Sequence, residues 1–335
     1  MRVLLFGGSG TLSGAAREVF LAAGHDVAVV SRGSRPLPSH PRLRALKADR
    51  REAASLAAVL AGEKFDFTAD FLAYDGDDLS RLFSVPGFSP GRFAMISSGQ
   101  VYLVTEGRTP PFRESDSEAP LMPAPPEGTR DRREWDYGMG KRAAEATLRL
   151  EASALGFPAL ALRLPVVQGE ADASLRLWAW LERMKDGGPV LLPGGGLQPV
   201  RFVYAGDAAA ALLRLSGLKD WPAAPALNLA QPAENTLKEF LEMAASLAGL
   251  RPEFVRVPGE ELAKAGLADT CAPYWGRWCS RPDPSAAFSL GFTARGPQDY
   301  LPSVVRAHLD APPASSHPGY ARRAEELALA AKMLE

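Results

Sequence analysis

The chain begins with an apolar run that ends in a glycine-rich turn, and this feature restricts the fold more than any other. Residues 2–6, RVLLF, have the continuous apolar pattern of a strand buried on both faces. GGSGTLSG follows, and then an amphipathic stretch from Ala15 to Ala23, which Gly24 closes. Glycines let a backbone turn tightly and approach a pyrophosphate, and the free N–H groups of a helix start bind that anion. This order predicts a dinucleotide site.

The turn supplies the first set of candidate cofactor-binding residues: Gly7, Ser9, Gly10, Thr11 and Leu12. A GxxGxxG spacing would place a third glycine at position 13, where this chain has Ser13 followed by Gly14. Because that third glycine serves close packing of the helix on the strand, we expect slightly altered helix packing there.

Four further apolar runs predict strands that alternate with helical segments, namely HDVAVVSR, FDFTADFLAY, FAMISS and ALALRLPVV. Such alternation is typical of an α/β fold with a doubly wound parallel sheet, the Rossmann arrangement. We therefore expect a nucleotide-binding domain with the catalytic residues in 1–168. A smaller, mainly substrate-binding C-terminal lobe is expected in 169–335, with a segment at about 200–230 returning to the first domain.

Two other segments have distinct compositions. Residues 109–127 are crowded with prolines, which exclude a regular helix or a central strand, so we expect a long surface loop. Whether that loop is part of a lid or an ordinary insertion stays open at this point. Residues 320–335 are rich in Ala, Leu and Glu and predict a terminal helix.

The end of the second predicted strand bears on the choice of nucleotide. Ser31, Arg32 and Arg35 stand where a NAD-selective protein usually carries an acidic residue for the ribose hydroxyls. A guanidinium instead pairs with a 2′-phosphate, and a serine hydroxyl adds a hydrogen bond. NADP(H) is therefore the preferred cofactor and NAD(H) the second candidate, while the competing interpretation makes both arginines solvated surface charges.

A second group of polar residues fits proton transfer. Tyr137 and Lys141 are four residues apart in a segment that forms helix, so both side chains project from one face. An ammonium beside a phenol stabilises the phenolate and lowers the pKa of the tyrosine from about 10. Ser98 ends a predicted parallel strand, at the edge where open α/β sheets bind ligands. Each residue also has a purely structural interpretation, but their joint order after a nucleotide turn favours a catalytic site.

The composition argues against several classes of protein. The 335 residues carry a formal charge of −1, which gives no overall field for nucleic acid or an anionic membrane. Two cysteines and four scattered histidines lack metal-ligand spacing, so no metal is expected. No apolar run reaches the length of a signal peptide or a membrane span. We expect a cytoplasmic monomer or homodimer that binds a small molecule.

With these motifs in place, the chain resembles the extended short-chain dehydrogenase/reductase superfamily, in particular its NAD-dependent epimerase/dehydratase family. The likeness runs from residue 1 to about 300 and is carried by FGGSGTLSG, ADRRE, SSGQVY, YGMGK, RLPVVQG, RFVYAGDAA and AAFSLGF. SRGSRP, ADRRE and FDFTADFLAY are most similar to the branch that includes chloroplast stem-loop-binding proteins.

The resemblance implies roles for individual residues. Tyr137 would be the acid/base, Lys141 its modulator and a nicotinamide-ribose ligand, and Ser98 the hydroxyl that orients the substrate. The remaining implied cofactor contacts are Asp49 and Arg50 near adenine, Leu72, Ala73 and Tyr74 along the middle of the cofactor, and Pro165 and Val167 beside the nicotinamide. Two departures are Gly140, where the family often has a small hydroxyl residue, and the long gap between Ser98 and Tyr137.

The motifs and the resemblance together leave three candidate functions. The leading one is an NAD(P)H-dependent oxidoreductase that acts on a carbonyl or secondary alcohol of a small molecule. A nucleotide-sugar epimerase or dehydratase with retained NAD is the nearest alternative. A non-catalytic RNA-binding relative is the alternative from another class, and the near-zero charge and the Ser98, Tyr137 and Lys141 set argue against it.

Overall fold

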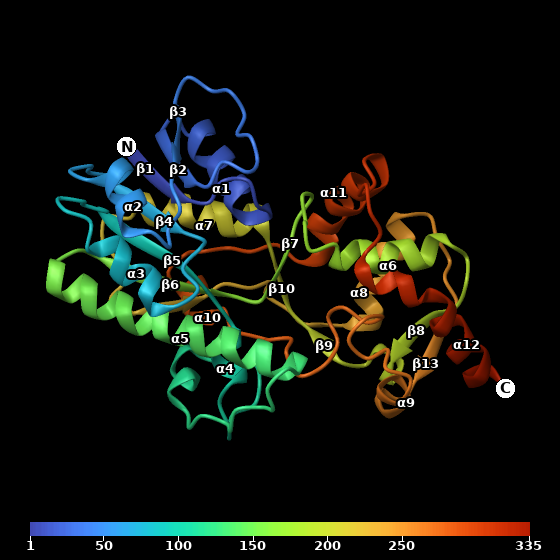
Figure 1. The fold of residues 1–335 in the computed structure, drawn as a ribbon. Coiled ribbons are helices and arrows are strands. Elements are labelled where there is room, and N and C mark those ends of the chain that lie inside the picture. The colour runs from blue at the N-terminus through green and yellow to red at the C-terminus, as the bar shows by residue number, and fades with distance from the viewer. The chain divides into compact units, whose positions relative to one another are not determined.

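The computed structural model describes residues 1–335, which form two compact units (Figure 1). Unit 1 consists of Met1–Val167, Phe202–Ala230 and Ser280–Ala294. Unit 2 consists of Gln168–Arg201, Gln231–Cys279 and Arg295–Glu335. No helix has the length and apolar composition needed to cross a membrane.

Unit 1 is built from alternating strands and helices. Its strands are β1 (Arg2–Phe6), β2 (Asp26–Ser31), β3 (Leu43–Lys47), β4 (Phe67–Asp70), β5 (Arg92–Ser98), β6 (Ala159–Leu164), β10 (Phe202–Tyr204) and β11 (Ala226–Asn228). Its helices are α1 (Thr11–Ala22), α2 (Ala53–Leu60), α3 (Gly76–Phe83), α4 (Gln100–Leu103), the 3-10 helix η1 (Glu114–Glu118), α5 (Arg130–Leu155), α7 (Ala205–Gly217) and α10 (Ser285–Ser289). The short strand β7 (Val166–Gln168) ends at the boundary of the unit.

Seven of these strands form one parallel sheet in the order β11-β6-β5-β4-β1-β2-β3. This confirms the predicted doubly wound α/β fold. The strand order reverses between β1 and β4, whose last residues, Phe6 and Asp70, are paired in register. Ligands of open α/β sheets bind outside the carboxyl ends of the strands at such a switch point.

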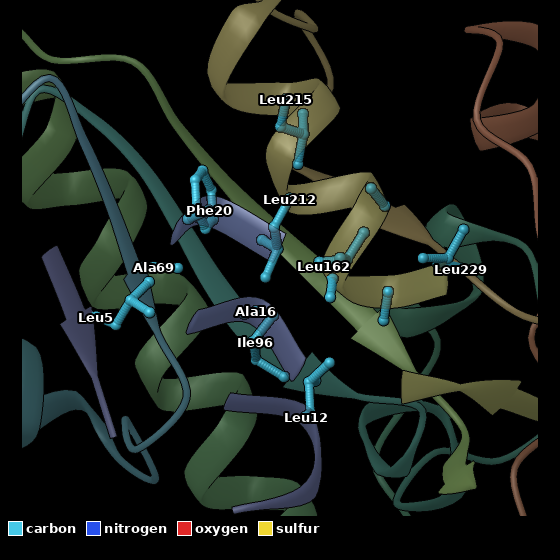
Figure 2. Packing of buried hydrophobic residues seen from close by; sticks show 14 of the residues in the cluster. Leu5, Leu12, Ala16, Phe20, Ala69, Ile96, Leu162, Leu212, Leu215 and Leu229 are labelled. Atoms are coloured by element: carbon cyan, nitrogen blue, oxygen red, sulfur yellow. The ribbon is translucent and has the colours of Figure 1, made fainter. Parts of the chain in front are cut away.

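Helices cover both faces of the sheet, because the central strands are buried on both sides. On one face, α1 and α7 pack on the sheet through a cluster that includes Leu5, Ala16, Phe20 and Leu212 (Figure 2). The helices α2, α3 and α5 lie on the other face (Figure 1), and their side chains pack in the cluster that includes Leu4. Two apolar cores therefore hold the strand ends of unit 1 in fixed positions.

Some elements have other boundaries than the sequence predicts. Prolines and the carboxylate at the end of one strand explain these differences. The run ALALRLPVV forms two strands, since Pro165 has no N–H for the ladder and separates β6 from β7. β4 ends at Asp70. The Asp70 carboxylate accepts the N–H of Leu72 at 2.8 Å, so this N–H forms no hydrogen bond with a neighbouring strand. The proline-rich stretch 109–127 contains η1 over its proline-free residues, so it is not wholly irregular.

Unit 2 contains shorter strands and several helices. They are α6 (Arg176–Lys185), β8 (Val190–Pro193), the 3-10 helix η2 (Gly194–Gly196), β9 (Pro199–Val200), β12 (Asn235–Thr236), α8 (Leu237–Leu247), β13 (Phe254–Val257), α9 (Gly259–Lys264), α11 (Pro297–Asp310), the 3-10 helix η3 (Pro318–Arg322) and α12 (Arg323–Leu334). The expected C-terminal helix is thus present as η3 and α12. It docks on α6 through the buried pair of Arg183 and Glu326, 2.6 Å apart.

Candidate cofactor and catalytic site

A cavity of about 530 Å³ opens in unit 1 at the switch point between β1 and β4. Ten of the predicted cofactor-binding residues line it: Gly7, Ser9, Gly10, Ser31, Arg32, Arg35, Asp49, Arg50, Leu72 and Tyr74. The volume lies in the usual range for small-molecule and cofactor sites. Residues from four separate stretches of the sequence are therefore brought together on one cavity.

The glycine turn approaches the sheet more closely than side chains would allow. Gly7 adopts a φ of +91°, a conformation that favours glycine. A Cβ at Gly8 would lie 2.6 Å from a methyl carbon of Val29, so Gly8 provides the close packing. Ser13, where a third glycine was expected, accepts the N–H of Gly10 at 3.1 Å. The turn before α1 therefore lies close to the sheet and is braced by the Ser13 hydroxyl.

The cavity is lined by five arginines and three aspartates. Arg32 and Arg35 are exposed there, and Ser34, Arg51 and Arg81 also line the cavity although they were not predicted from the sequence. Ser31 accepts the N–H of Gly33 at 3.3 Å. Arg51 directly follows the predicted pair Asp49 and Arg50, which was the available signal for it.

Arg50 lines the cavity but is committed to other protein groups. Its Nη1 donates to Asp70 Oδ1 at 2.7 Å, and its Nη2 donates to the Asp78 carbonyl at 3.2 Å. Asp49 accepts the N–H of Arg51 at 2.9 Å, which shapes the turn after β3. The adenine-side contact predicted for Arg50 would therefore come from the part of its side chain that faces the cavity.

Lys141 is buried inside unit 1, with only 2% of its surface exposed. Its Nζ donates to the carbonyl oxygens of Ala73 at 2.6 Å and Ile96 at 2.9 Å. Burial lowers the pKa of Lys141 to about 8, and the negative charge of Asp70 opposes that change. Ala73 thus meets the candidate catalytic lysine through its carbonyl oxygen.

Tyr74 connects the cavity with the predicted catalytic pair. Tyr74 lines the cavity, and its ring centre lies 6.3 Å from that of Tyr137. The Nζ of Lys141 lies 4.9 Å from the Tyr74 ring centre and 5.9 Å from that of Tyr137. A Cβ at Gly140 would lie 2.5 Å from the Tyr74 carbonyl oxygen, which explains why no larger residue precedes the lysine.

The turn that carries Ser98 is packed against α5, the helix that contains Tyr137 and Lys141. Ser98 accepts the N–H of Gln100 at 3.2 Å, and the Gln100 side chain donates to Glu134 of α5 at 2.6 Å. A Cβ at Gly138 would lie 2.8 Å from the Gln100 carbonyl oxygen, so α4 and α5 meet closely beside Tyr137. The fold of unit 1 thereby anchors the Ser98 turn on the helix that carries Tyr137 and Lys141.

The other predicted contacts, Thr11, Leu12, Pro165 and Val167, do not line the cavity. Thr11 begins α1, and the Leu12 side chain belongs to the hydrophobic core. Pro165 follows Leu164, whose carbonyl accepts the N–H of Gly99, and Val167 lies two residues beyond Pro165. These roles remain predictions.

A buried polar network fixes the proline-rich segment to the sheet. Arg163 of β6 pairs with Glu145 of α5 at 2.6 Å and donates to Tyr102 at 3.0 Å. It also donates to the Glu114 carbonyl at 2.8 Å and to the Ser117 hydroxyl at 3.0 Å. Arg163 is therefore satisfied within unit 1, and the segment around η1 is held in place by it.

Unit 1 also has a larger groove, of about 1010 Å³, at the amino ends of the strands. Met1, Asp66, Arg92 and Pro158 line it, each at the start of a strand or just before one. Because open α/β sheets bind ligands at the opposite edge, the smaller cavity at the switch point is the better candidate.

Part of the chain matches the model of a known protein family. The model of the NAD dependent epimerase/dehydratase family matches residues 80–228, which include β5, α5 and β6. Residues 80–228 of the chain are thus similar to the NAD dependent epimerase/dehydratase family. This confirms the resemblance to that family, while the likeness to its stem-loop-binding branch stays a prediction.

One curated protein to which this chain is similar is a 2′-dehydrokanamycin reductase from Streptomyces kanamyceticus. The two are 30% identical over 220 residues, which is 64% of this chain. The matched region spans 58% of the length of the reductase.

Solved structures share the fold. A UDP-glucose 4-epimerase from Thermotoga maritima superposes with a TM-score of 0.72 at 17% identity, covering 92% of this chain and 99% of the epimerase. A dTDP-glucose 4,6-dehydratase from Streptomyces venezuelae, solved with NAD, has a TM-score of 0.68 at 19% identity, with 92% and 97% covered. These likenesses support the Rossmann architecture of this chain.

Proposed function

We propose that this protein is an NAD(P)H-dependent oxidoreductase that reduces a carbonyl or oxidises a secondary alcohol of a small molecule. The observation that carries the proposal is the position of Tyr74. Tyr74 lines the cofactor-sized cavity, and its ring lies beside the ring of Tyr137 and the Nζ of Lys141. The similarity to a reductase over 220 residues supports the same class of reaction.

The residues around the cavity fit a dinucleotide. The turn at Gly7 and Gly8 has no side chain between backbone and cavity, and the start of α1 offers N–H groups to a pyrophosphate. The exposed Arg32 and Arg35 on the rim fit a 2′-phosphate, so we propose NADP(H) as the preferred form and NAD(H) as a weaker ligand.

The proposed chemistry needs three groups of this chain. When bound, the nicotinamide supplies or accepts the hydride. Tyr137 passes a proton to or from the reacting oxygen, and the Lys141 ammonium stabilises the phenolate form of Tyr137. Ser98 donates a hydrogen bond to that oxygen and polarises the carbonyl. We further propose unit 2 as the lobe that binds the rest of the substrate.

Replacing Tyr137 by Phe tests this assignment. NADPH-dependent reduction is measured with a panel of ketones that includes 2′-dehydrokanamycin, and NADPH binding is measured separately by fluorescence titration. Tyr137→Phe is expected to lower kcat by about 10²-fold or more, because general acid–base catalysis contributes that much, while NADPH binding changes little.

Tyr320→Phe is the matched control, since it removes a hydroxyl that donates to Asp186 in unit 2. It is expected to leave turnover unchanged. Undiminished turnover in Tyr137→Phe contradicts the proposed mechanism. NAD that stays bound through purification would instead favour an epimerase or dehydratase.

A further inference from the structure

We propose that Asp70, together with Arg50 and Asp78, forms a charged clamp that positions Lys141 and keeps its ammonium protonated. The three residues come from the turn after β3, from the end of β4 and from α3. Lys141 Nζ donates to backbone carbonyls rather than to any of these side chains, so each of the three is a positioning residue. The inference rests on the proposed function only in the role that it gives to Lys141.

The clamp fixes the backbone on both sides of Ala73. Asp70 Oδ1 accepts the N–H of Leu72 at 2.8 Å, and Asp78 Oδ2 accepts the N–H of Tyr74 at 2.9 Å. Ala73 is the residue between them, and its carbonyl accepts Lys141 Nζ at 2.6 Å. Two carboxylates therefore determine where the hydrogen-bond acceptor of Lys141 lies.

Arg50 joins the two carboxylates to each other. Its Nη1 lies 2.7 Å from Asp70 Oδ1, and its Nε lies 3.2 Å from Asp78 Oδ1, an ion-pair distance without hydrogen-bond geometry. The three side chains are 11%, 0% and 7% exposed for Arg50, Asp70 and Asp78. Such a buried group is held rigidly, because breaking one contact leaves an unpaired charge in the interior.

Asp70 is the carboxylate of the clamp that acts most strongly on the charge of Lys141. Asp78 pairs with Arg81 at 3.4 Å as well as with Arg50, so its charge is more fully neutralised. Both hydrogen-bond acceptors of Lys141 are neutral carbonyls, so its buried ammonium depends on nearby carboxylates to stay charged. Asp70 also has an oxygen, Oδ2, that is buried without a hydrogen-bond partner.

Other groups face Lys141 from the elements packed around it. Glu145 lies one turn further along α5 and is neutralised by Arg163 of β6. The rings of Tyr74 and Tyr137 lie on the remaining sides. Burial lowers the pKa of Lys141 to about 8, and Asp70 is the leading group that acts against this change. Arg50 acts in the same direction as burial, so the carboxylates of the clamp, with Asp70 first, are what favours the charged form of Lys141.

The titration of Lys141 tests the clamp without any substrate. The chain has eight lysines, so ¹³C-labelled lysine gives few NMR signals, and the signal lost in Lys141→Arg identifies Lys141. Its midpoint is measured in the wild-type protein and in Asp70→Asn. Asn keeps the shape and can still accept the Leu72 N–H, so only the charge is removed. The midpoint is expected to fall by about one pH unit.

Asp77→Asn is the matched control, since that side chain is 84% exposed on the first turn of α3. It is expected to leave the midpoint unchanged. If Asp70→Asn does not fold by circular dichroism, Asp78→Asn replaces it, with a shift in the same direction. An unchanged midpoint in the folded clamp variant, or an equal shift in Asp77→Asn, overturns the inference. Neither result depends on turnover, so the proposed function stands or fails separately.

Discussion

At the end of β2, Arg32 and Arg35 carry exposed positive charge on the rim of the cavity. A guanidinium recognises a phosphate through charge and two parallel hydrogen bonds, which a ribose hydroxyl cannot match. Ser31 lies just before them and accepts the Gly33 N–H, so the backbone of this turn is held in place. We therefore expect a few side chains to decide the choice between the two nicotinamide dinucleotides.

Arg32→Gln is expected to weaken NADPH binding about 10-fold or more, because a hydrogen bond to a charged group contributes about 1.5–3 kcal/mol. NADH binding should change much less, since NADH has no 2′-phosphate. Fluorescence titration of both nucleotides measures the two dissociation constants. Arg44→Gln on β3 serves as the control, because Arg44 pairs with Glu63 and does not line the cavity. Equal weakening of both nucleotides contradicts the assignment of Arg32.

The helix α5 is the element on which the candidate catalytic residues depend. It lacks a side chain at Gly138, where it meets α4, and at Gly140, where it meets the Tyr74 carbonyl. Both close contacts lie within the one helical turn that leads from Tyr137 to Lys141. The helix therefore approaches both the Ser98 turn and the cavity wall because those two positions are glycine.

Gly140→Ala is expected to lower the free energy of unfolding by about 1–3 kcal/mol, because its Cβ would lie 2.5 Å from a backbone oxygen. Urea unfolding followed by circular dichroism measures the change. Gly217→Ala, at the end of α7, meets nothing within 4 Å and is expected to leave stability equal or raise it by up to about 1 kcal/mol. If both variants lose the same stability, the close approach at Gly140 is not the cause.

An element of unit 1 could be predicted from the sequence where its run of apolar residues coincides with the residues that are buried in the fold. The apolar runs that become β1, β2 and β5 are such cases, since a strand covered on both faces needs little else. The clamp could not be foreseen, because Arg50 and Asp70 are 20 residues apart and meet only when β4 is placed in the sheet. The same holds for Arg163 and the η1 segment, whose hydrogen bonds span 46 and 49 residues.

At the scale of the molecule, the chain passes between its two units several times. Residues 202–230 and 280–294 belong to unit 1 although long stretches of unit 2 precede each of them. The later segment was not expected in the first domain, because it contributes only the five-residue helix α10 and no strand of the sheet. Its Ala287 and Phe292 nevertheless belong to the core that supports α7.

Solving the structure with NADP, beside a parallel experiment with NAD, tests the central proposal most directly. We expect the pyrophosphate on the turn of Gly7 to Gly10, the 2′-phosphate against Arg32, and the nicotinamide near Tyr137. We also expect NADP to occupy the cavity at a lower concentration than NAD. An empty cavity at saturating concentrations of both nucleotides, or a nicotinamide directed away from Tyr137, would contradict the proposal.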